Sequence, residues 1–127
     1  MPTRVELPTV RDLYVPGAFL PFISGPQARR LDCWTRYDGD LAELAAAFPR
    51  LTYCSPGDRP QRYTADELQR TAALAQQEGV WAELRELELC PSLNNSDVIL
   101  TLSDLVPLLR CLPCLERVSL CRAELSV

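Results

Sequence analysis

The sequence predicts an α/β solenoid arc, in which short parallel strands line one side and helices cover the convex side. Three observations predict this fold. An apolar motif recurs five times, the segments between its copies have a helical period, and 127 residues suffice for one modest core but not for two ordinary domains. One strand-helix unit cannot bury its apolar faces alone, so successive units must stack. We therefore expect a single domain over residues 1–127, built from about five irregular repeats.

The recurrent motif consists of an apolar residue, two intervening residues, a second apolar residue, one intervening residue and a third apolar residue. Its copies are VRDLYV (10–15), ARRLDC (28–33), LTYCSP (51–56), LRELEL (84–89) and LERVSL (115–120). The second half of each copy alternates apolar and polar positions, which predicts a short strand with one buried face. The middle anchors of the five copies are Leu13, Leu31, Cys54, Leu87 and Val118.

Two of the segments between the strands begin with a helix-capping residue. Residues 38–48 have apolar side chains at helical offsets behind Asp40, which we expect to cap the helix. The segment from Thr64 to Glu67 is a capping box, in which the Thr hydroxyl and the Glu carboxylate each satisfy an unpaired backbone N–H. This second helix should end near Gly79.

Proline and glycine mark the less regular segments. A third, shorter helix should begin near Ser103, with Pro107 close to its first turn, where a missing N–H is best tolerated. A proline and two glycines limit residues 17–25 to a single turn at most. Residues 55–63 and 90–100 are expected to form surface loops that lengthen the third and fourth repeats.

The composition restricts the chemistry. The net charge is −4, with 13 Lys plus Arg against 17 Asp plus Glu, which argues against binding to nucleic acid or to an anionic membrane through bulk charge. The chain has no histidine and no lysine, so the commonest general base and the usual catalytic amine are missing. Carboxylates alternate with arginines on the predicted strands, which is typical of a solvated face. We expect a protein that is not an enzyme.

The apolar runs are short. VILTL and FLPFI fall far below the roughly 20 residues that cross a bilayer, and the opening MPTRVELPTVRDL lacks the apolar stretch of a signal peptide. Six cysteines are too few for a small disulfide scaffold, so we expect them to be reduced. The protein is expected to be intracellular, cytoplasmic or nuclear, without a membrane partner.

The segments LPTVRDLYV, WAELRELEL and LPCLERVSL resemble leucine-rich repeats. Spacings of 18, 23, 33 and 31 residues between the middle anchors bracket the roughly 20 to 29 residues of such repeats. The irregular lengths, together with LPFISGPQARRLDCW, resemble the variable repeats that follow the F-box in fungal F-box proteins, although no F-box is visible in this sequence. The resemblance implies a protein-protein interaction module, the substrate-recognition part of an F-box-like ubiquitin ligase adaptor.

The exposed residues of the predicted strands should form one continuous surface that binds a protein partner of unknown identity. Candidate binding residues are Arg11, Tyr14, Arg29, Arg30, Asp32, Trp34, Tyr53, Arg85, Glu88 and Arg117. The same surface is expected to include Asp12, Thr52, Ser55, Glu86, Glu116 and Ser119. Trp34, near Tyr37, has two interpretations, because an aromatic side chain at a strand end either anchors a partner or packs under the next loop.

The cysteines also allow two interpretations. Cys33 and Cys54 occupy anchor positions, which favours small apolar core residues. We expect the thiols of the C-x-x-C pair, Cys111 and Cys114, to be buried as well. The alternative is a small cysteine-dependent metal or redox protein, whose site would use Cys90, Cys111, Cys114 and Cys121. We expect no cofactor and no metal. An uncapped last repeat would leave an apolar edge and allow self-association.

Overall fold

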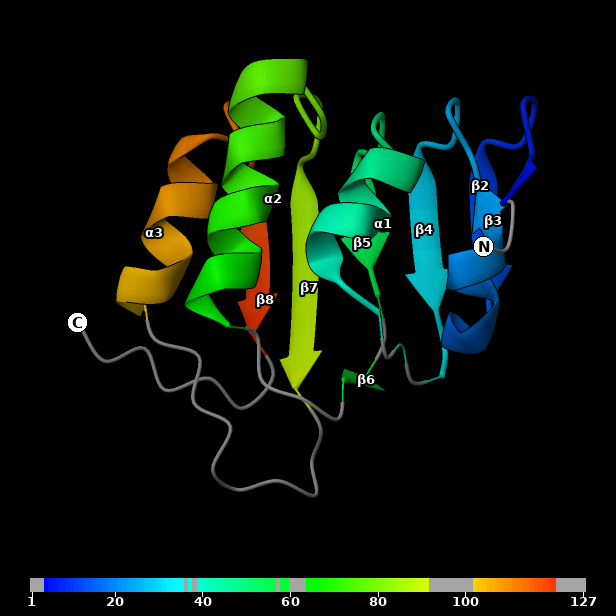
Figure 1. Cartoon of the computed structure of the whole chain (residues 1–127), viewed down its shortest axis with the longest axis horizontal. Coiled ribbons are helices and arrows are strands. Elements are labelled where there is room, and N and C mark those ends of the chain that lie inside the picture. Colours follow the sequence, from blue (N-terminus) through cyan, green and yellow to red (C-terminus); the bar gives the residue numbers. More distant parts are fainter. Residues whose placement is uncertain are drawn as a thin grey trace.

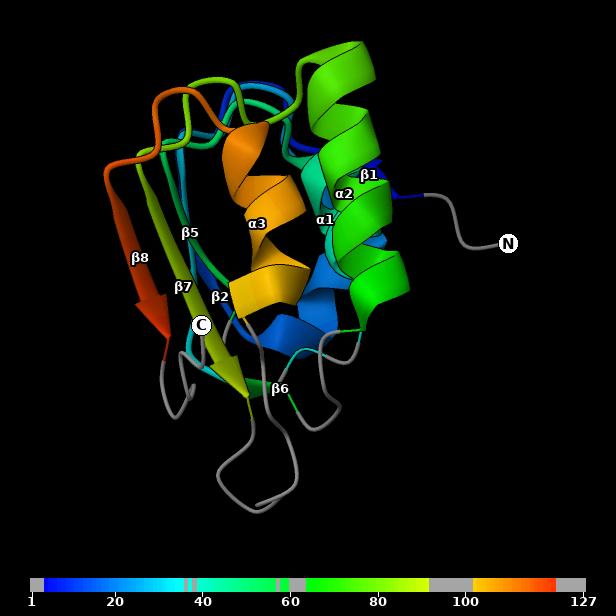
Figure 2. The same ribbon diagram turned by 90° about the vertical axis from the view of Figure 1, so that its left-hand side faces the viewer.

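The computed structural model describes residues 4–35, 37, 39–56, 58–59, 64–91 and 102–120. In this part of the chain, parallel strands form one layer and helices form a second layer on one face of the sheet (Figures 1 and 2). The N-terminal and C-terminal elements lie at opposite ends of the long axis (Figure 1). The fold class is α/β with parallel strands, as the sequence predicts.

Each of the five predicted strands forms in the structure. They are β2 (Asp12–Val15), β4 (Arg30–Cys33), β5 (Tyr53–Ser55), β7 (Glu86–Pro91) and β8 (Arg117–Leu120). Each strand pairs in parallel with the one that follows it in this series, so spatial order repeats chain order. Along the chain, a helical segment lies between each strand of this series and the next.

The register of the sheet aligns the predicted middle anchors in one row. Successive pairings join Leu13 to Leu31, Leu31 to Cys54, Cys54 to Leu87 and Leu87 to Val118. The first four of these side chains are buried and Val118 is half-buried. The apolar motif therefore predicted both the strands and their register, because side chains at every second position point to the same face of a strand.

One hydrogen-bonding arrangement recurs at the start of successive strands. The carbonyl oxygens of Arg11, Arg29, Thr52 and Arg85 each accept two backbone N–H groups from the following strand segment, at 2.6 to 3.1 Å. Each donor pair consists of the first residue of that strand and the residue before it. The shared carbonyl fixes where each strand begins relative to its neighbour.

The helical layer is built from α1 (Leu41–Ala47), α2 (Ala65–Glu78) and α3 (Leu102–Arg110). Their inward side chains pack on the buried face of the sheet in one hydrophobic core. Trp81, in the turn between α2 and β7, is fully buried and donates its Nε1–H to the carbonyl of Phe48 at 3.0 Å. The indole therefore joins the turns that follow α1 and α2 while its polar group stays paired.

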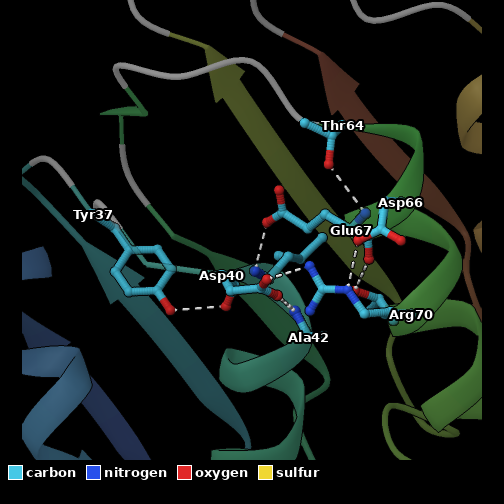
Figure 3. Close-up of polar contacts among 9 residues, drawn as sticks. Tyr37, Asp40, Ala42, Thr64, Asp66, Glu67 and Arg70 are labelled. Carbon is cyan, nitrogen blue, oxygen red and sulfur yellow. Dashed lines mark hydrogen bonds and ion pairs between the residues drawn. The ribbon is translucent and has the colours of Figure 1, made fainter.

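Asp40 and Thr64 cap their helices as predicted, and Glu67 of the predicted capping box joins the two helices (Figure 3). Asp40 accepts the N–H of Ala42 at 2.7 Å, and the Thr64 hydroxyl accepts the N–H of Glu67 at 3.1 Å. The buried Glu67 carboxylate reaches the other helix and accepts the N–H of Leu41 at 2.6 Å. Arg70 pairs with Asp40 at 2.6 Å, so charged groups at the two helix starts are linked.

The predicted end of α2 is confirmed, whereas the predicted position of Pro107 in α3 is wrong. Gly79 ends α2 with φ of 71°, in the left-handed region that glycine adopts without steric cost. Pro107 lies in the second turn of α3, not near the first, because this helix begins at Leu102 and continues to Arg110. It therefore removes an N–H that an interior helical residue would donate.

Four further elements differ from the prediction. The 3₁₀ helix η1 (Gly17–Phe22) contains about two turns, where a single turn was expected. The short strands β1 (Val5–Glu6) and β3 (Ile23–Ser24) form a separate parallel pair that the motif did not predict. Within the predicted surface loop 55–63, residues 58 and 59 form β6, which pairs with the end of β7.

We predict that Leu87→Ala lowers the free energy of unfolding by about 2–5 kcal/mol, because Leu87 is fully buried in the row of middle anchors and the change leaves a cavity. Denaturant titration measures the change. Gln76→Ala, at an exposed position of α2, is the control and should stay within about 0.5 kcal/mol of the parent. A Leu87→Ala effect as small as that of the control would contradict the register.

We also predict that Glu67→Ala destabilises the chain by about 1–3 kcal/mol, because it leaves the N–H of Leu41 without this acceptor at a buried helix start. Glu67→Gln keeps the length and a carbonyl acceptor, so it should cost less than the alanine variant. Equal losses for the two variants in denaturant titration would show that the contact to Leu41 does not stabilise α1.

Candidate protein-binding face

The sheet surface that points away from the helices is called the strand face. Successive side chains along a strand point in turn to the core and to this face. One row across the strands is set by the pairings of Asp12, Arg30, Tyr53, Glu86 and Arg117. The sheet register, which the buried row requires, therefore also brings charged and aromatic groups from distant parts of the sequence side by side.

Arg30 on the strand face contacts two neighbouring side chains. Its guanidinium carbon lies 4.1 Å from the centroid of the Tyr53 ring, within cation–π distance, and its NH2 lies 3.7 Å from an oxygen of Asp32. The Arg30 side chain nevertheless keeps about half of its surface exposed. Neighbours thus hold the guanidinium in place while one side remains available to a partner.

Tyr14 and Trp34 form an exposed aromatic pair at the carboxyl ends of β2 and β4. Their ring centroids are 4.6 Å apart with planes inclined by 42°. The two residues keep 65% and 52% of their surface exposed, so neither packs into the core. The interpretation of Trp34 as a core residue under the next loop is therefore wrong.

Tyr53 occupies the middle strand of the face and is half-buried. Burial raises the pKa of its hydroxyl to about 12, and the charge and hydrogen bond of Glu88, with the charge of Asp32, act in the same direction. The phenol therefore remains protonated at neutral pH. It offers a ring to Arg30 and a hydroxyl donor to Glu88.

Two shallow hollows lie side by side near the amino ends of the strands. The larger, of about 420 Å³, is lined by Arg29, Thr52, Glu83, Arg85 and Cys114. Inside it, the Arg29 guanidinium forms an ion pair with Glu83. The second hollow, of about 260 Å³, shares Thr52 and Arg85 with the first and extends to Arg30, Tyr53, Glu86 and Glu116. Arg85 thus lines both hollows.

The ten predicted binding residues lie on the strands or directly beside them. Exposed members are Arg11, Tyr14, Arg30, Trp34, Arg85 and Arg117, and half-buried members are Arg29, Asp32, Tyr53 and Glu88. The described contacts bring together Tyr14 with Trp34 and Arg30 with Asp32 and Tyr53. The Arg117 guanidinium lies 3.9 Å from Glu86.

Two polar residues predicted to lie on this surface are buried, and the sequence pattern did not predict a third residue that lies there. Ser55, the last residue of β5, was expected on the surface but is buried. Tyr37, which the binding interpretation grouped with Trp34, is buried and donates its hydroxyl to the Asp40 carbonyl at 2.9 Å. Glu83 was missed because it lies in a turn, where no periodicity marks the direction of a side chain.

The described cysteines differ in burial. Cys33 and Cys54 are buried, as predicted for anchors. Burial raises the pKa of the Cys33 thiol to about 12, with a further contribution from the charge of Asp32, and burial also raises the pKa of Cys54. Cys111 is half-buried, and Cys114 is exposed, so the buried-thiol prediction is wrong for Cys114. A turn residue beside a proline is not constrained to the core.

The alternative site required four cysteines. The side chains of Cys90 and Cys121 lie outside the described residues, so the complete set is not seen together. Within the described part of the chain, no group of three or more Cys, Asp or Glu side chains is arranged to hold a metal ion. Cys111 and Cys114 flank the turn between α3 and β8.

We predict that Cys114 reacts with iodoacetamide near pH 8 far faster than Cys33 or Cys54. The Cys33 thiolate fraction at that pH is about 10⁻⁴, because its pKa is about 12, and burial also blocks access. Peptide mass spectrometry measures the rates, and urea should equalise them. Labelling of Cys33 in the native protein as fast as that of Cys114 would contradict the burial of Cys33.

Comparison with protein-family models, with curated proteins and with solved structures finds no match to this chain. Among the helices of the described residues, none has both the length and the apolar character needed to cross a membrane.

Proposed function

We propose that the chain is a non-catalytic protein-binding module of leucine-rich-repeat type, a single α/β solenoid arc of about five irregular repeats. The order of the strands supports this proposal, since each pairs in parallel with the next one of the series. The recurrent shared carbonyl supports it as well, because the same junction appears at spacings that follow the motif. In such arrays the exposed strand residues form the usual binding surface.

The observation that carries the proposal is the exposed pair of Tyr14 and Trp34 beside Arg30. Tryptophan, tyrosine and arginine are the residues most enriched among those that dominate binding energy. Here the two rings contact each other, and Arg30 is held by Asp32 and Tyr53. Side chains ordered before binding lose less conformational entropy on association.

The nature of the partner follows from the resemblance to the repeats of F-box proteins. We propose that the strand face recognises the substrate of an F-box-like ubiquitin ligase adaptor, acting in the cytoplasm or nucleus. The exposed thiol of Cys114 and the unbridged cysteines Cys33, Cys54 and Cys111 are compatible with a reducing compartment. Recovery of ligase components together with the partner would support this assignment, and a partner that never associates with them would oppose it.

We predict that Arg30→Ala combined with Trp34→Ala weakens partner capture from native extract by at least about 30-fold, because an interface anchor is worth about 2 kcal/mol or more and loss of even one of the two has that effect. The double variant should retain the melting curve of the parent, because both side chains are exposed. Quantitative affinity capture and thermal melting are measured on the same preparation.

The matched control is Arg50→Ala combined with Gln77→Ala, which removes an arginine and a second exposed side chain away from the strand face. This variant should capture the partner as the parent does. Undiminished capture by the Arg30 and Trp34 variant, or equal loss in the control, would refute the proposed face.

A further inference from the structure

The two outer strands of the sheet each have one strand neighbour among the described residues. β2 pairs with β4 at the N-terminal end of the molecule, and β8 pairs with β7 at the other end (Figure 1). An outer strand presents a row of backbone N–H and C=O groups to whatever lies beside it. The register described above determines which backbone groups each edge presents.

The recurrent junction predicts which groups the β8 edge presents. Arg117 donates its N–H to Arg85, and alternate residues of a parallel strand bond to opposite neighbours. The N–H and C=O of Val118 therefore point away from β7, and the carbonyl of Glu116 occupies the position that accepts two N–H groups at each earlier junction. By the same alternation, the N–H and C=O of Asp12 point away from β4.

The side chains at the two edges are complementary in charge and in polarity. The exposed row begins with Asp12 on β2 and ends with Arg117 on β8, whose side chain is 73% exposed. The buried row begins with Leu13 and ends with Val118. If β2 of one molecule continued the sheet beside β8 of another in the same register, opposite charges and apolar groups would each be paired.

The distribution of exposed apolar side chains favours contact at these ends. The large apolar residues exposed in the described chain all precede residue 35, and they are Val5, Tyr14, Phe19, Phe22 and Trp34. Val5, Phe19 and Phe22 belong to β1 and η1, which lie at the N-terminal end of the molecule (Figure 1). The opposite end, with α3 and β8, carries the half-buried side chains of Leu109 and Leu115.

We propose that the protein associates with itself head to tail, by parallel pairing of β2 of one copy with β8 of the next. Arg117 then lies opposite Asp12 of the second copy, and Val118 lies opposite its Leu13. The Glu116 carbonyl accepts the N–H groups of Arg11 and Asp12 of that copy. Because the two contact surfaces differ, each added copy leaves the same free ends, and association forms open chains or rings rather than a closed two-fold dimer.

Sedimentation velocity over a concentration series tests the proposal on the full chain. The expected result is a sedimentation coefficient that rises with concentration through species larger than a dimer. A monomer at every concentration up to the millimolar range overturns the proposal. This is also the result expected if another segment of the same chain covers β8. A single dimer that does not grow overturns the head-to-tail arrangement.

Charge reversal at the two ends supplies a sharper test. Arg117→Glu alone places Glu opposite Asp12, and Asp12→Arg alone places Arg opposite Arg117, so each variant should associate at least about tenfold more weakly than the parent. An equimolar mixture of the two variants restores opposite charges at both kinds of junction. We expect the mixture to assemble when neither variant does so alone.

Arg50→Glu makes the same charge change away from both edges and should associate like the parent. Melting curves establish that the variants are folded, and both substituted side chains are exposed. Val118→Pro removes the outward N–H of β8 without removing the N–H that Arg117 donates to Arg85, and should also prevent association. Failure of the mixture to assemble, or normal association of Val118→Pro, overturns the proposed pairing.

Discussion

The shared carbonyl at the starts of β4, β5, β7 and β8 is the constraint on which the rest of the structure depends. Two N–H groups of one strand segment bond to one oxygen of the previous segment, so each strand begins at a fixed position relative to its neighbour. A shift of one residue would turn the buried row toward solvent and the charged row toward the core. This one register therefore determines which side chains enter the core beneath the helical layer and which lie on the strand face.

That register gives neighbouring charges on the strand face their partners. Arg30 meets Asp32 on its own strand and Tyr53 on the next, while Arg117 meets Glu86 across β7 and β8. Exposed ion pairs of this kind contribute little to stability, about 0–1 kcal/mol each. Their effect is to hold long side chains in defined positions on a surface whose stability comes from the opposite, apolar face.

The sequence was sufficient for the strands because the motif couples backbone register to burial. Leu31, Cys54 and Leu87 are buried in one row as the apolar spacing predicts. Caps were equally readable, since Asp40 and Thr64 act through their own local backbone. Local signals could not show that Glu67 reaches the start of a different helix, because that contact depends on how α1 and α2 pack.

The errors share a physical cause, which is that turns and short pairs lack periodicity. β1 and β3 contain two residues each, too few for any alternation to be recognised. Tyr37 and Cys114 lie in loops, where only tertiary contacts decide that the tyrosine is buried and the thiol is exposed. Among the binding candidates, the exposure of Trp34 could not be predicted, because the residue follows the last position of its strand.

Hydroxyl-radical footprinting of the chain, free and bound to its captured partner, tests the central claim most directly, because it reports on side chains rather than on the backbone. If the strand face is the binding surface, oxidation of Tyr14, Trp34 and Tyr53 should fall when the partner binds. Leu74, on α2 in the helical layer, should be oxidised equally in both states. Protection of Leu74 with unchanged Tyr14 and Trp34 would contradict the account and place the partner on the helices.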